Sequence, residues 1–491
     1  MASIRKPRRN RLSKAQRQQR RQRQTRQARV VRRRLRALHD QLPGPAQRFL
    51  DWLLQPFARP TALRLTLLLC AALLTVGNHT VLNLLRTLGP LVPGDSSSYR
   101  RVFSQRRWSS VRLARQLVTW VVQQLVPDGP IRVAGDDTVD GHRGKHVYGK
   151  GRHRDPVRST HTYTAFRWGH KWVVLAVLVP FPFTRRLWAL PVLVALTRSE
   201  EENQRLRRRH KTPPELLRQL LLVLLRWFPQ RHFICAADGN FATHDLAGCA
   251  RRYAPRLIYL SHFYAKANLY APPPEVVPGK KPSGRPRKKG PKLPPPAEVV
   301  RQTPPQERQR LNVAWYGGGR RDVEVVTGTG QWYEAGAPLV PVLWVWVHDL
   351  TGTHRDEYFF TTEPSWTAAQ VLETYTGRWN IETTFQEMRA YLGLETTRGW
   401  TEKTVLRVAP GLFGLYTVVA VLYVQLPARL RQQGLITWPG KQDVTFSDAL
   451  TAVRRWLWVQ WVFAIPGHNA AFSKLGHPFR EMLLAGLAPA A

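Results

Sequence analysis

The sequence predicts an α/β protein with helices at its N-terminus and a sheet of acid-bearing strands behind them. From about residue 129, short apolar runs alternate with segments of helical spacing, in the order three strands, helix, strand, helix, strand. Two of the runs end in aspartate, and a strand that ends in Asp presents its carboxylate at the edge of a sheet. The chain also holds 75 Lys and Arg against 32 Asp and Glu, a formal net charge of +43. That charge predicts strong, salt-sensitive attraction to phosphate backbones.

Residues 1–40 form a basic segment with almost no apolar side chains. Its cations are separated mainly by Gln and Ser and include Arg5, Lys6, Arg8, Arg9, Arg11, Lys14, Arg17, Arg20 and Arg21. Such a segment cannot bury enough surface to offset its chain entropy, so we expect a disordered arm that orders when it meets DNA. A solvated tail with no task is the alternative.

Helical spacing follows in residues 41–128. We predict helices over Leu63–Val76, Thr80–Leu88 and Ser109–Val126, with a tight turn at Gly77-Asn78-His79 and Thr80 as an N-cap. A helix, a tight turn and a second helix are typical of DNA-reading domains. We therefore expect a helical DNA-binding domain at 41–128, with a helical cap on the catalytic core as the alternative.

Strands, helices and one polar loop make up residues 129–268. We predict strands over Ile131–Thr138, Tyr163–Trp168, Lys171–Pro180, His232–Asp238 and Arg256–Phe263, and helices over Pro214–Phe228 and Thr243–Tyr253. A turn at Gly169-His170 would join the second and third strands in a hairpin. The loop over residues 140–155 is rich in glycine and cations, among them Arg143, Lys145, Lys150 and Arg152, and suits contact with phosphates.

One helical segment near the C-terminal end carries the most informative residues. Arg378, Glu382 and Arg389 are four and then seven residues apart, so on a helix they lie along one face, with Tyr375 about one turn earlier. The adjacent apolar stripe that would pack this helix down consists of Ile381, Phe385 and Met388. An isolated Arg-x3-Glu is an ordinary ion pair on a helix surface, but the full pattern is rarer.

The pattern Tyr-x2-Arg-x3-Glu-x6-Arg resembles the signature around the last catalytic acid of DDE-type insertion-sequence transposases, in the bacterial subgroup named for Tyr-Arg-Glu-Lys. Arg389 stands where many members carry Lys, which keeps the charge but replaces a compact ammonium with a planar fork. The resemblance covers roughly residues 60–430. It implies a ribonuclease H-like core with two more catalytic acids upstream on strands.

Asp238 and one of the adjacent residues Asp136 and Asp137 match those two upstream acids. Similar relatives read Asp-Glu-Thr before a basic run, and that register favours Asp136, with Asp137 as the alternative. With Glu382 they form an ordered set of three acids, as two divalent metal ions require. The resemblance implies that Asp136, Asp238 and Glu382 hold two Mg²⁺ ions, for which Mn²⁺ can substitute.

The resemblance also implies an activity and partners. The activity is cleavage and strand transfer of an insertion sequence by in-line phosphoryl displacement. Tyr375, Arg378 and Arg389 would grip phosphates beside the scissile bond. The partners would be double-stranded DNA, as inverted-repeat ends and as target, and a second copy of the chain in a synaptic homodimer, in the bacterial cytoplasm at the nucleoid. An inactive or domesticated DNA-binding relative, and a nuclease of the same superfamily without strand transfer, are the alternatives.

The 143 residues between Asp238 and Glu382 are too many for a simple connection, and the resemblance implies a β-rich insertion there. Residues 271–310 are rich in Pro, Lys and Arg and predict an exposed linker, and strand patterns follow at 311–315, 321–327, 340–348 and 358–361. Aromatic residues here, which pack in the core or stack on an unpaired base, are Trp315, Trp332, Tyr333, Trp344 and Trp346.

The domain organisation follows from these assignments. We expect the first part of the core at 129–268, the linker and insertion at 269–365, the last catalytic helix and a packing helix at 366–430, and a C-terminal helical region at 431–491. The apolar stretches Leu65–Leu85 and Val408–Leu426 are long enough to span a bilayer, but their polar and helix-breaking residues suit buried helices better, so no membrane span is expected. Cys70, Cys235 and Cys249 lack metal-ligand spacing and even pairing, which argues against a structural zinc or a disulfide.

Overall fold

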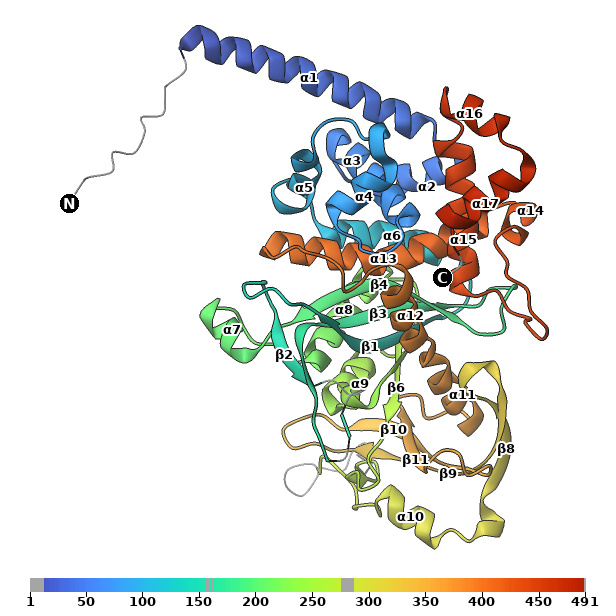
Figure 1. Cartoon of the computed structure of the whole chain (residues 1–491). Coiled ribbons are helices and arrows are strands. Elements are labelled where there is room, and N and C mark those ends of the chain that lie inside the picture. Colours follow the sequence, from blue (N-terminus) through green and yellow to red (C-terminus); the bar gives the residue numbers. More distant parts are fainter. Residues whose placement is uncertain (1–12, 155–158, 161, 275–286, 490–491) are drawn as a thin grey trace.

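The computed structural model describes the chain except residues 1–12, 155–158, 161, 275–286 and 490–491 (Figure 1). The strands are β1 (Ile131–Gly141), β2 (Gly151–Arg154), β3 (Phe166–Val179), β4 (Trp188–Thr197), β5 (Phe233–Ala237), β6 (Leu257–His262), β7 (Leu269–Tyr270), β8 (Gln309–Ala314), β9 (Arg320–Trp332), β10 (Val340–Asp349) and β11 (Glu357–Thr361). Within the described residues they join into one mixed sheet of eleven strands in the order β2-β3-β1-β5-β6-β11-β10-β9-β7. Strand β4 also pairs with β3, and β8 with β9.

Helices surround this sheet in a mixed α/β architecture. The N-terminal ones are α1 (Lys14–Asp40), α2 (Gly44–Leu54), α3 (Arg59–Leu74), α4 (Val81–Leu88), α5 (Ser96–Ser104) and α6 (Ser110–Gln124). Between strands lie α7 (Glu200–Arg205), α8 (Pro213–Trp227), α9 (His244–Arg252) and α10 (Pro296–Gln302). The remainder are α11 (Ala368–Arg378), α12 (Asn380–Tyr391), α13 (Glu402–Gln425), α14 (Ala428–Gln432), α15 (Phe446–Leu457), α16 (His468–Lys474) and α17 (His477–Leu487).

The central strands bury apolar side chains on both faces, because successive side chains of a strand alternate. Ala236 of β5 belongs to a cluster with Leu372 and Tyr375 of α11. Its neighbours Cys235 and Ala237 belong to the larger core, which includes the inward faces of α8 and α9. Helix α11 therefore covers one face of β5, and α8 and α9 cover the opposite face, while α12 contacts β1 and β4.

The predicted hairpin at Gly169-His170 is wrong, because residues 166–179 form the single strand β3. In the antiparallel pairing of β1 and β3, Asp140 is opposite His170 and Gly141 opposite Gly169. A Cβ at Gly169 would stand 1.8 Å from the carbonyl oxygen of Asp140, so this glycine permits a close approach of two strands and makes no turn. The outer partner of β3 is β4, an apolar strand that the sequence analysis did not predict.

The strands predicted for the insertion extend the core sheet. Strand β11 pairs with β6, and β10, β9 and β8 follow outward in antiparallel pairs. Helix α10 lies within the stretch predicted to be an extended linker, whose residues 275–286 are outside the described part. The four candidate stacking tryptophans are at most 7% exposed and pack in the core: Trp315, Trp332, Trp344 and Trp346.

Helices from both ends of the chain form a layer against β4. Helix α13 contacts β4 on one side and α3, α5, α6 and α15 on others (Figure 1). The side chain of Arg454 on α15 donates to the carbonyl oxygens of Leu73 and Thr75, at 2.8 and 3.1 Å, where α3 ends. Within the described ranges α13 is the one helix long and apolar enough to cross a membrane, and 72% of that apolar window is buried. Packing inside the protein therefore accounts for its composition.

The predicted turn between α3 and α4 and its cap are confirmed. Thr80 precedes α4, and its side chain accepts a hydrogen bond from the backbone N–H of Asn83 at 3.2 Å. Local spacing therefore predicted this turn and its cap correctly. Elsewhere in the fold, the three cysteines are buried as free thiols.

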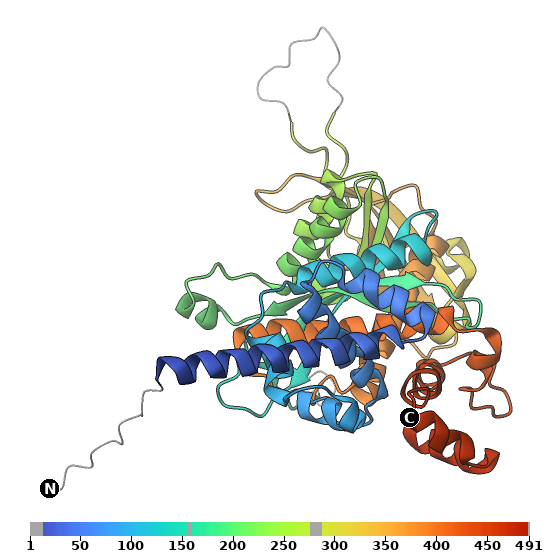
Figure 2. The same cartoon turned by 90° about the horizontal axis from the view of Figure 1, so that it is seen from above.

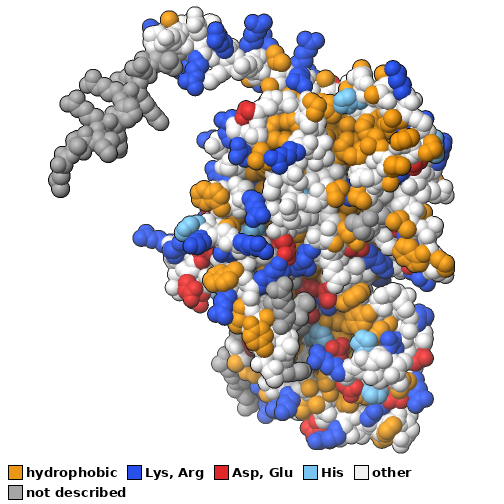
Figure 3. All heavy atoms as spheres, in the orientation of Figure 1, with side chains coloured by type: hydrophobic (Ala, Val, Ile, Leu, Met, Phe, Trp, Pro, Cys, Tyr) orange, Lys and Arg blue, Asp and Glu red, His pale blue; other side chains and the backbone are white. Residues whose placement is uncertain are grey.

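The predicted disordered arm forms a helix over Lys14–Asp40, and its residues 1–12 lie outside the described part of the chain. Ser13 and Gln16 form a capping box, with both of its hydrogen bonds present, and the Arg, Gln and Ala residues that follow are favourable in helices. Only the end of α1 is anchored: Leu35 and Leu38 are buried, and Trp461 Nε1 donates to the carbonyl oxygen of Leu38 at 2.9 Å. Upstream, α1 extends away from the body with its basic side chains exposed (Figures 2 and 3).

Deleting residues 1–29 should flatten the salt dependence of duplex binding while leaving sequence preference unchanged. Each phosphate neutralised by a Lys or Arg releases roughly 0.9 counterion, and phosphate contacts carry no direct sequence information. The deletion keeps Val31 and Leu35, which pack on the core. Dissociation constants over a range of salt concentrations, for inverted-repeat and random duplexes, test this. Loss of preference at an unchanged salt slope would show that the arm reads sequence.

Candidate active site

Two of the predicted acids lie side by side because β1 and β5 are parallel and in register. The pairing matches Gly135 with Ala237, so the next residues, Asp136 and Asp238, are neighbours. Asp238 directly follows the end of β5, and in parallel α/β sheets chemistry collects outside these carboxyl ends. Pairing of β5 with β6 continues the row, because it matches Ala236 with Leu260 and thereby brings His262 next to Asp238.

Arg378 brings Glu382 to these two aspartates. Its guanidinium donates from Nη1 to Asp136 Oδ2 at 2.9 Å and from Nη2 to Glu382 Oε1 at 3.1 Å. The same Nη2 lies 3.8 Å from Asp238 Oδ1. The Arg378 side chain is only 4% exposed. The three carboxylates predicted from the sequence therefore converge on one buried cation.

The single helix predicted around the signature is two helices. Helix α11 ends at Arg378 and α12 begins at Asn380, with Trp379 between them. Trp379 keeps φ and ψ of −54° and −21°, in the right-handed helical region, so Arg378 and Glu382 still approach across the junction. The predicted apolar stripe of α12 is confirmed, since Ile381, Phe385 and Met388 are all buried.

The acid set suits a hard divalent cation. The pKa of Asp136 is raised to about 8, mainly by burial and also by the neighbouring carboxylates of Asp238 and Glu382, against the opposing effect of Arg378. Three carboxylates exceed the charge of one guanidinium, so the site has surplus negative charge and several oxygen ligands. Magnesium prefers such ligands. The residues present therefore fit the metal ions that the sequence implies.

Asp137 faces away from this set, because neighbouring side chains of β1 alternate between the two faces. Its Oδ2 lies 2.9 Å from Nζ of Lys171 on β3. Asp136 instead contacts Arg378, and its Oδ1 accepts a hydrogen bond from the backbone N–H of Asp137 at 2.7 Å. The geometry therefore groups Asp136, and not Asp137, with Asp238 and Glu382.

The other two signature residues hold the helices to the sheet. Tyr375 is 1% exposed, with ring centroids of Phe359 and His262 at 4.3 and 4.9 Å and the Arg378 guanidinium 5.2 Å from its own centroid. Tyr375 and Arg378 thus lie within the protein, whereas direct phosphate contacts would require open surface. Arg389 binds the hydroxyl of Thr138 and, at 3.2 Å each, the carbonyl oxygen of Val139 and Glu395 Oε1.

Several residues around the site were not predicted from the sequence: Thr138, Lys171, His262 and Glu395. Thr138 is two residues after Asp136 on β1 and therefore shares its face. Lys171 and His262 reach the site through strand pairing, and Glu395 through the segment after α12, so no spacing along the chain indicates these three. Burial lowers the pKa of His262, which favours a neutral imidazole beside Asp238. The sequence signals were the spacing of Thr138 two residues after Asp136 and the position of His262 near the end of a predicted strand.

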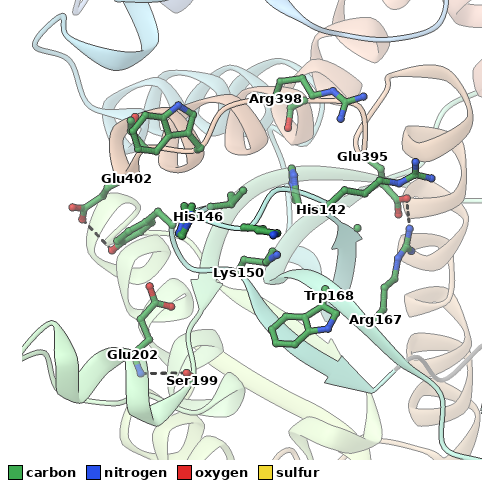
Figure 4. Close-up of a pocket in the computed structure, with 18 of the residues that line it drawn as sticks. His142, His146, Lys150, Arg167, Trp168, Ser199, Glu202, Glu395, Arg398 and Glu402 are labelled. Atoms are coloured by element: carbon green, nitrogen blue, oxygen red, sulfur yellow. Dashed lines mark hydrogen bonds and ion pairs between the residues drawn. The ribbon is translucent and has the colours of Figure 1, made fainter.

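The predicted basic loop borders a cavity of about 1520 Å³ (Figure 4). Residues 141–150 line one side, and residues 395–402 line another. Arg143 and Lys145 are exposed there. Lys150 Nζ donates to the carbonyl oxygen of Gly144 at 2.5 Å and lies 5.3 Å from the ring centroid of Trp168. Arg152 does not line this cavity and instead stacks over Phe166 at 4.0 Å.

Two aspartates on neighbouring parallel strands and a glutamate from the helix packed over them are the arrangement expected of a nucleic-acid-cleaving enzyme of the DDE type. The sequence family described as DDE superfamily endonuclease matches residues 52–322, more than half of the chain, and the chain belongs to that family. The matched range contains Asp136 and Asp238 and ends before Glu382.

Among solved structures, the chain is similar to a piggyBac transposase synaptic complex with hairpin DNA, determined by cryo-EM. Sequence identity is 11% and the TM-score is 0.39, over 88% of this chain and 77% of that chain. A comparison with curated protein sequences gave no match.

Metal-free protein should lose stability as pH rises, because the pKa of Asp136 is raised from its usual 3.8 to about 8. The protonated carboxyl stabilises the fold fully below pH 4, and this contribution disappears as pH rises towards 8. In EDTA, the unfolding free energy of the wild type should fall relative to Asp136→Asn by up to about 1.4 kcal/mol per pH unit in this window. Denaturant unfolding at pH 5, 6.5 and 8 measures the difference, and a constant difference would contradict the raised pKa.

Proposed function

We propose that this chain is the transposase of a bacterial insertion sequence, in the Tyr-Arg-Glu-Lys subgroup, and that it cuts and joins DNA strands by in-line phosphoryl displacement. The convergence of Asp136, Asp238 and Glu382 on Arg378 carries the proposal. Apart from the short β2 and α7, the chain order is β1-β3-β4-α8-β5-α9-β6 with β1, β5 and β6 parallel, which supports a ribonuclease H-like core.

Asp136, Asp238 and Glu382 would hold two Mg²⁺ ions, which Mn²⁺ can replace. Such ions activate a water or 3′-hydroxyl and stabilise the leaving oxygen of the phosphodiester. The protein fixes the ligands from two directions: backbone pairing of β1 and β5 sets the two aspartates, and the contacts of Arg378 and Arg389 set α12 with Glu382. Such fixation keeps the carboxylates in place for an in-line reaction.

Arg378 would order the acids and leave phosphate binding to other residues. Its Nη1 and Nη2 already occupy Asp136 Oδ2 and Glu382 Oε1, so a metal ion must compete with it for these oxygens. A buried charge without a partner is costly. Arg378 supplies the positive charge that compensates the three neighbouring carboxylates. Its planar fork suits this role, because it contacts several acids at once.

DNA phosphates would instead meet the cavity beside β1. Its rim presents Arg143, Lys145 and Arg398, and two tryptophans there, Trp168 and Trp400, are 57% and 64% exposed. Exposed aromatic faces beside cations are suited to unpaired bases and their backbone. We propose inverted-repeat ends and target DNA as the duplex partners, bound by a homodimer at the bacterial nucleoid.

Glu382→Gln should reduce strand cleavage on the order of 100-fold or more and leave DNA binding intact, because it removes a ligand charge at nearly constant shape. Mutating a residue that only hydrogen-bonds to a metal ligand already lowers metal affinity or activity roughly 10–100-fold. The matched control is Glu373→Gln on α11, whose carboxylate accepts from the backbone N–H of Ala314 at 3.0 Å, outside the acid set. Cleavage and strand transfer of a labelled inverted-repeat duplex in magnesium measure the effect. Retained cleavage in Glu382→Gln would exclude Glu382, and cleavage without strand transfer would favour a nuclease.

The adjacent acids should differ in the same assay. Asp136→Asn should abolish cleavage, since Asp136 shares Arg378 with the other two acids. Asp137→Asn should weaken cleavage only several-fold, because its partner is Lys171 on β3. The opposite order of effects would make Asp137 the metal ligand.

A further inference from the structure

A second group of metal-ligating side chains lies where β1 pairs with the beginning of β3. Asp140, His142 and His170 each offer one ligand atom, and these atoms all lie within 4.8 Å of one another. Asp140 Oδ2 is 3.5 Å from His142 Nε2, and Asp140 Oδ1 is 3.3 Å from His170 Nδ1. Ligands bound tetrahedrally at about 2.0–2.1 Å from zinc stand roughly 3.3–3.5 Å apart. Each histidine nitrogen already has that separation from one oxygen of Asp140, His142 from Oδ2 and His170 from Oδ1.

The hydrogen bonds of His170 direct an unprotonated nitrogen at a carboxylate. Its Nε2 lies 2.9 Å from the carbonyl oxygen of Tyr148, which can only accept, so Nε2 carries a proton. In the neutral ring Nδ1 then presents a lone pair, and this atom is buried without a hydrogen-bond partner next to Asp140 Oδ1. Two facing lone pairs repel unless a proton or a cation lies between them. Histidines that bind metals commonly donate their other N–H to a backbone carbonyl in this way.

Because a second imidazole faces Asp140, a divalent cation satisfies the cluster better than added protons would. The ring of His142 lies with its centroid 4.5 Å from that of His170, and both nitrogens face the same carboxylate. Protonating both rings would place two positive charges in contact, whereas one divalent ion satisfies both nitrogens. Asp140 is completely buried and is oriented by the backbone N–H of His170 at 3.0 Å and by Trp172 Nε1 at 3.3 Å. These bonds are the outer support that a ligating carboxylate requires.

We propose that Asp140, His142 and His170 bind a zinc ion at a site separate from the three catalytic acids. Two imidazoles and one carboxylate suit zinc, whereas magnesium prefers oxygen ligands alone. His142 lines the large cavity, which gives the ion a path from solvent (Figure 4). The spacing of the cysteines argued against a structural zinc, whereas this site consists of histidines and an aspartate and contains no cysteine.

The bound ion would join three segments at the end of β1. Asp140 belongs to β1, His170 to β3, and His142 to the start of the loop that carries Arg143 and Lys145. Zinc would therefore fix the base of this loop against the sheet. The site would act on the position of the loop cations and would leave the acid set unchanged.

Zinc binding by the full-length protein tests the proposal. Protein stripped with EDTA and then given zinc in excess magnesium should retain about one zinc per chain after gel filtration, measured by mass spectrometry of the metal, and its Tm should rise. His142→Gln should weaken zinc binding by about 10–100-fold or more. His146→Gln, on the same cavity but outside the cluster, should retain zinc, and so should Glu382→Gln. Loss of zinc in Glu382→Gln would instead assign the ion to the catalytic acids and overturn the proposal.

Two further results would also overturn the proposal: no zinc retained by the wild type, or equal zinc affinity in His142→Gln. A fall in the Tm of metal-free His142→Gln would leave misfolding as a cause of lost binding. Cobalt absorption by the unmodified protein then decides. Ligand-field bands in the visible range that persist in excess magnesium and disappear on adding zinc support the site, and absence of such bands contradicts it.

Discussion

The buried guanidinium of Arg378 is the interaction on which the acid set depends. It contacts Asp136 on a strand and Glu382 on a helix, and it closes the α11–α12 junction over the carboxyl end of β5. A charge so deeply buried is tolerated only where partners surround it. The position of Arg378 is set in turn by apolar packing, because α11 buries Leu372 and Tyr375 in the cluster beneath the sheet. Hydrophobic packing of α11 on β5, the strand that precedes Asp238, therefore sets the location of Glu382.

Sheet register supplies the remaining geometry. Asp136, Asp238 and His262 stand in a row because the three parallel strands β1, β5 and β6 pair in matched register. Side chains alternate along β1, so Asp136 and Asp137 point to opposite faces and Asp137 pairs with Lys171. A shift of one residue in this pairing would exchange their roles and send Asp136 to the opposite face. The chemistry of the two adjacent acids is therefore determined by backbone hydrogen bonds.

Features set by local spacing were predictable, and features set by pairing were not. The apolar stripe Ile381, Phe385 and Met388 and the cap at Thr80 follow from residues a turn apart, and the order of the three acids was visible along the chain. Helix α1 also had a local signal, since Ser13 and Gln16 have capping-box spacing, although the near absence of apolar side chains favoured a disordered arm. Gly169 was misread because its role depends on Asp140, which only the pairing of β1 and β3 brings within contact.

The same limit applies to the arrangement of the outer strands. Nothing in residues 309–361 indicates that they continue the core sheet, because the joining pair is β11 with β6, strands about a hundred residues apart. Strand β11 ends at Thr361 and α11 begins at Ala368, so the helix that carries Arg378 follows the insertion directly. Helix α11 also contacts β8 and β11, and Glu373 and Thr376 of α11 both hydrogen-bond to the backbone of Ala314 on β8. The outer strands therefore help to hold in place the helix that carries the buried guanidinium.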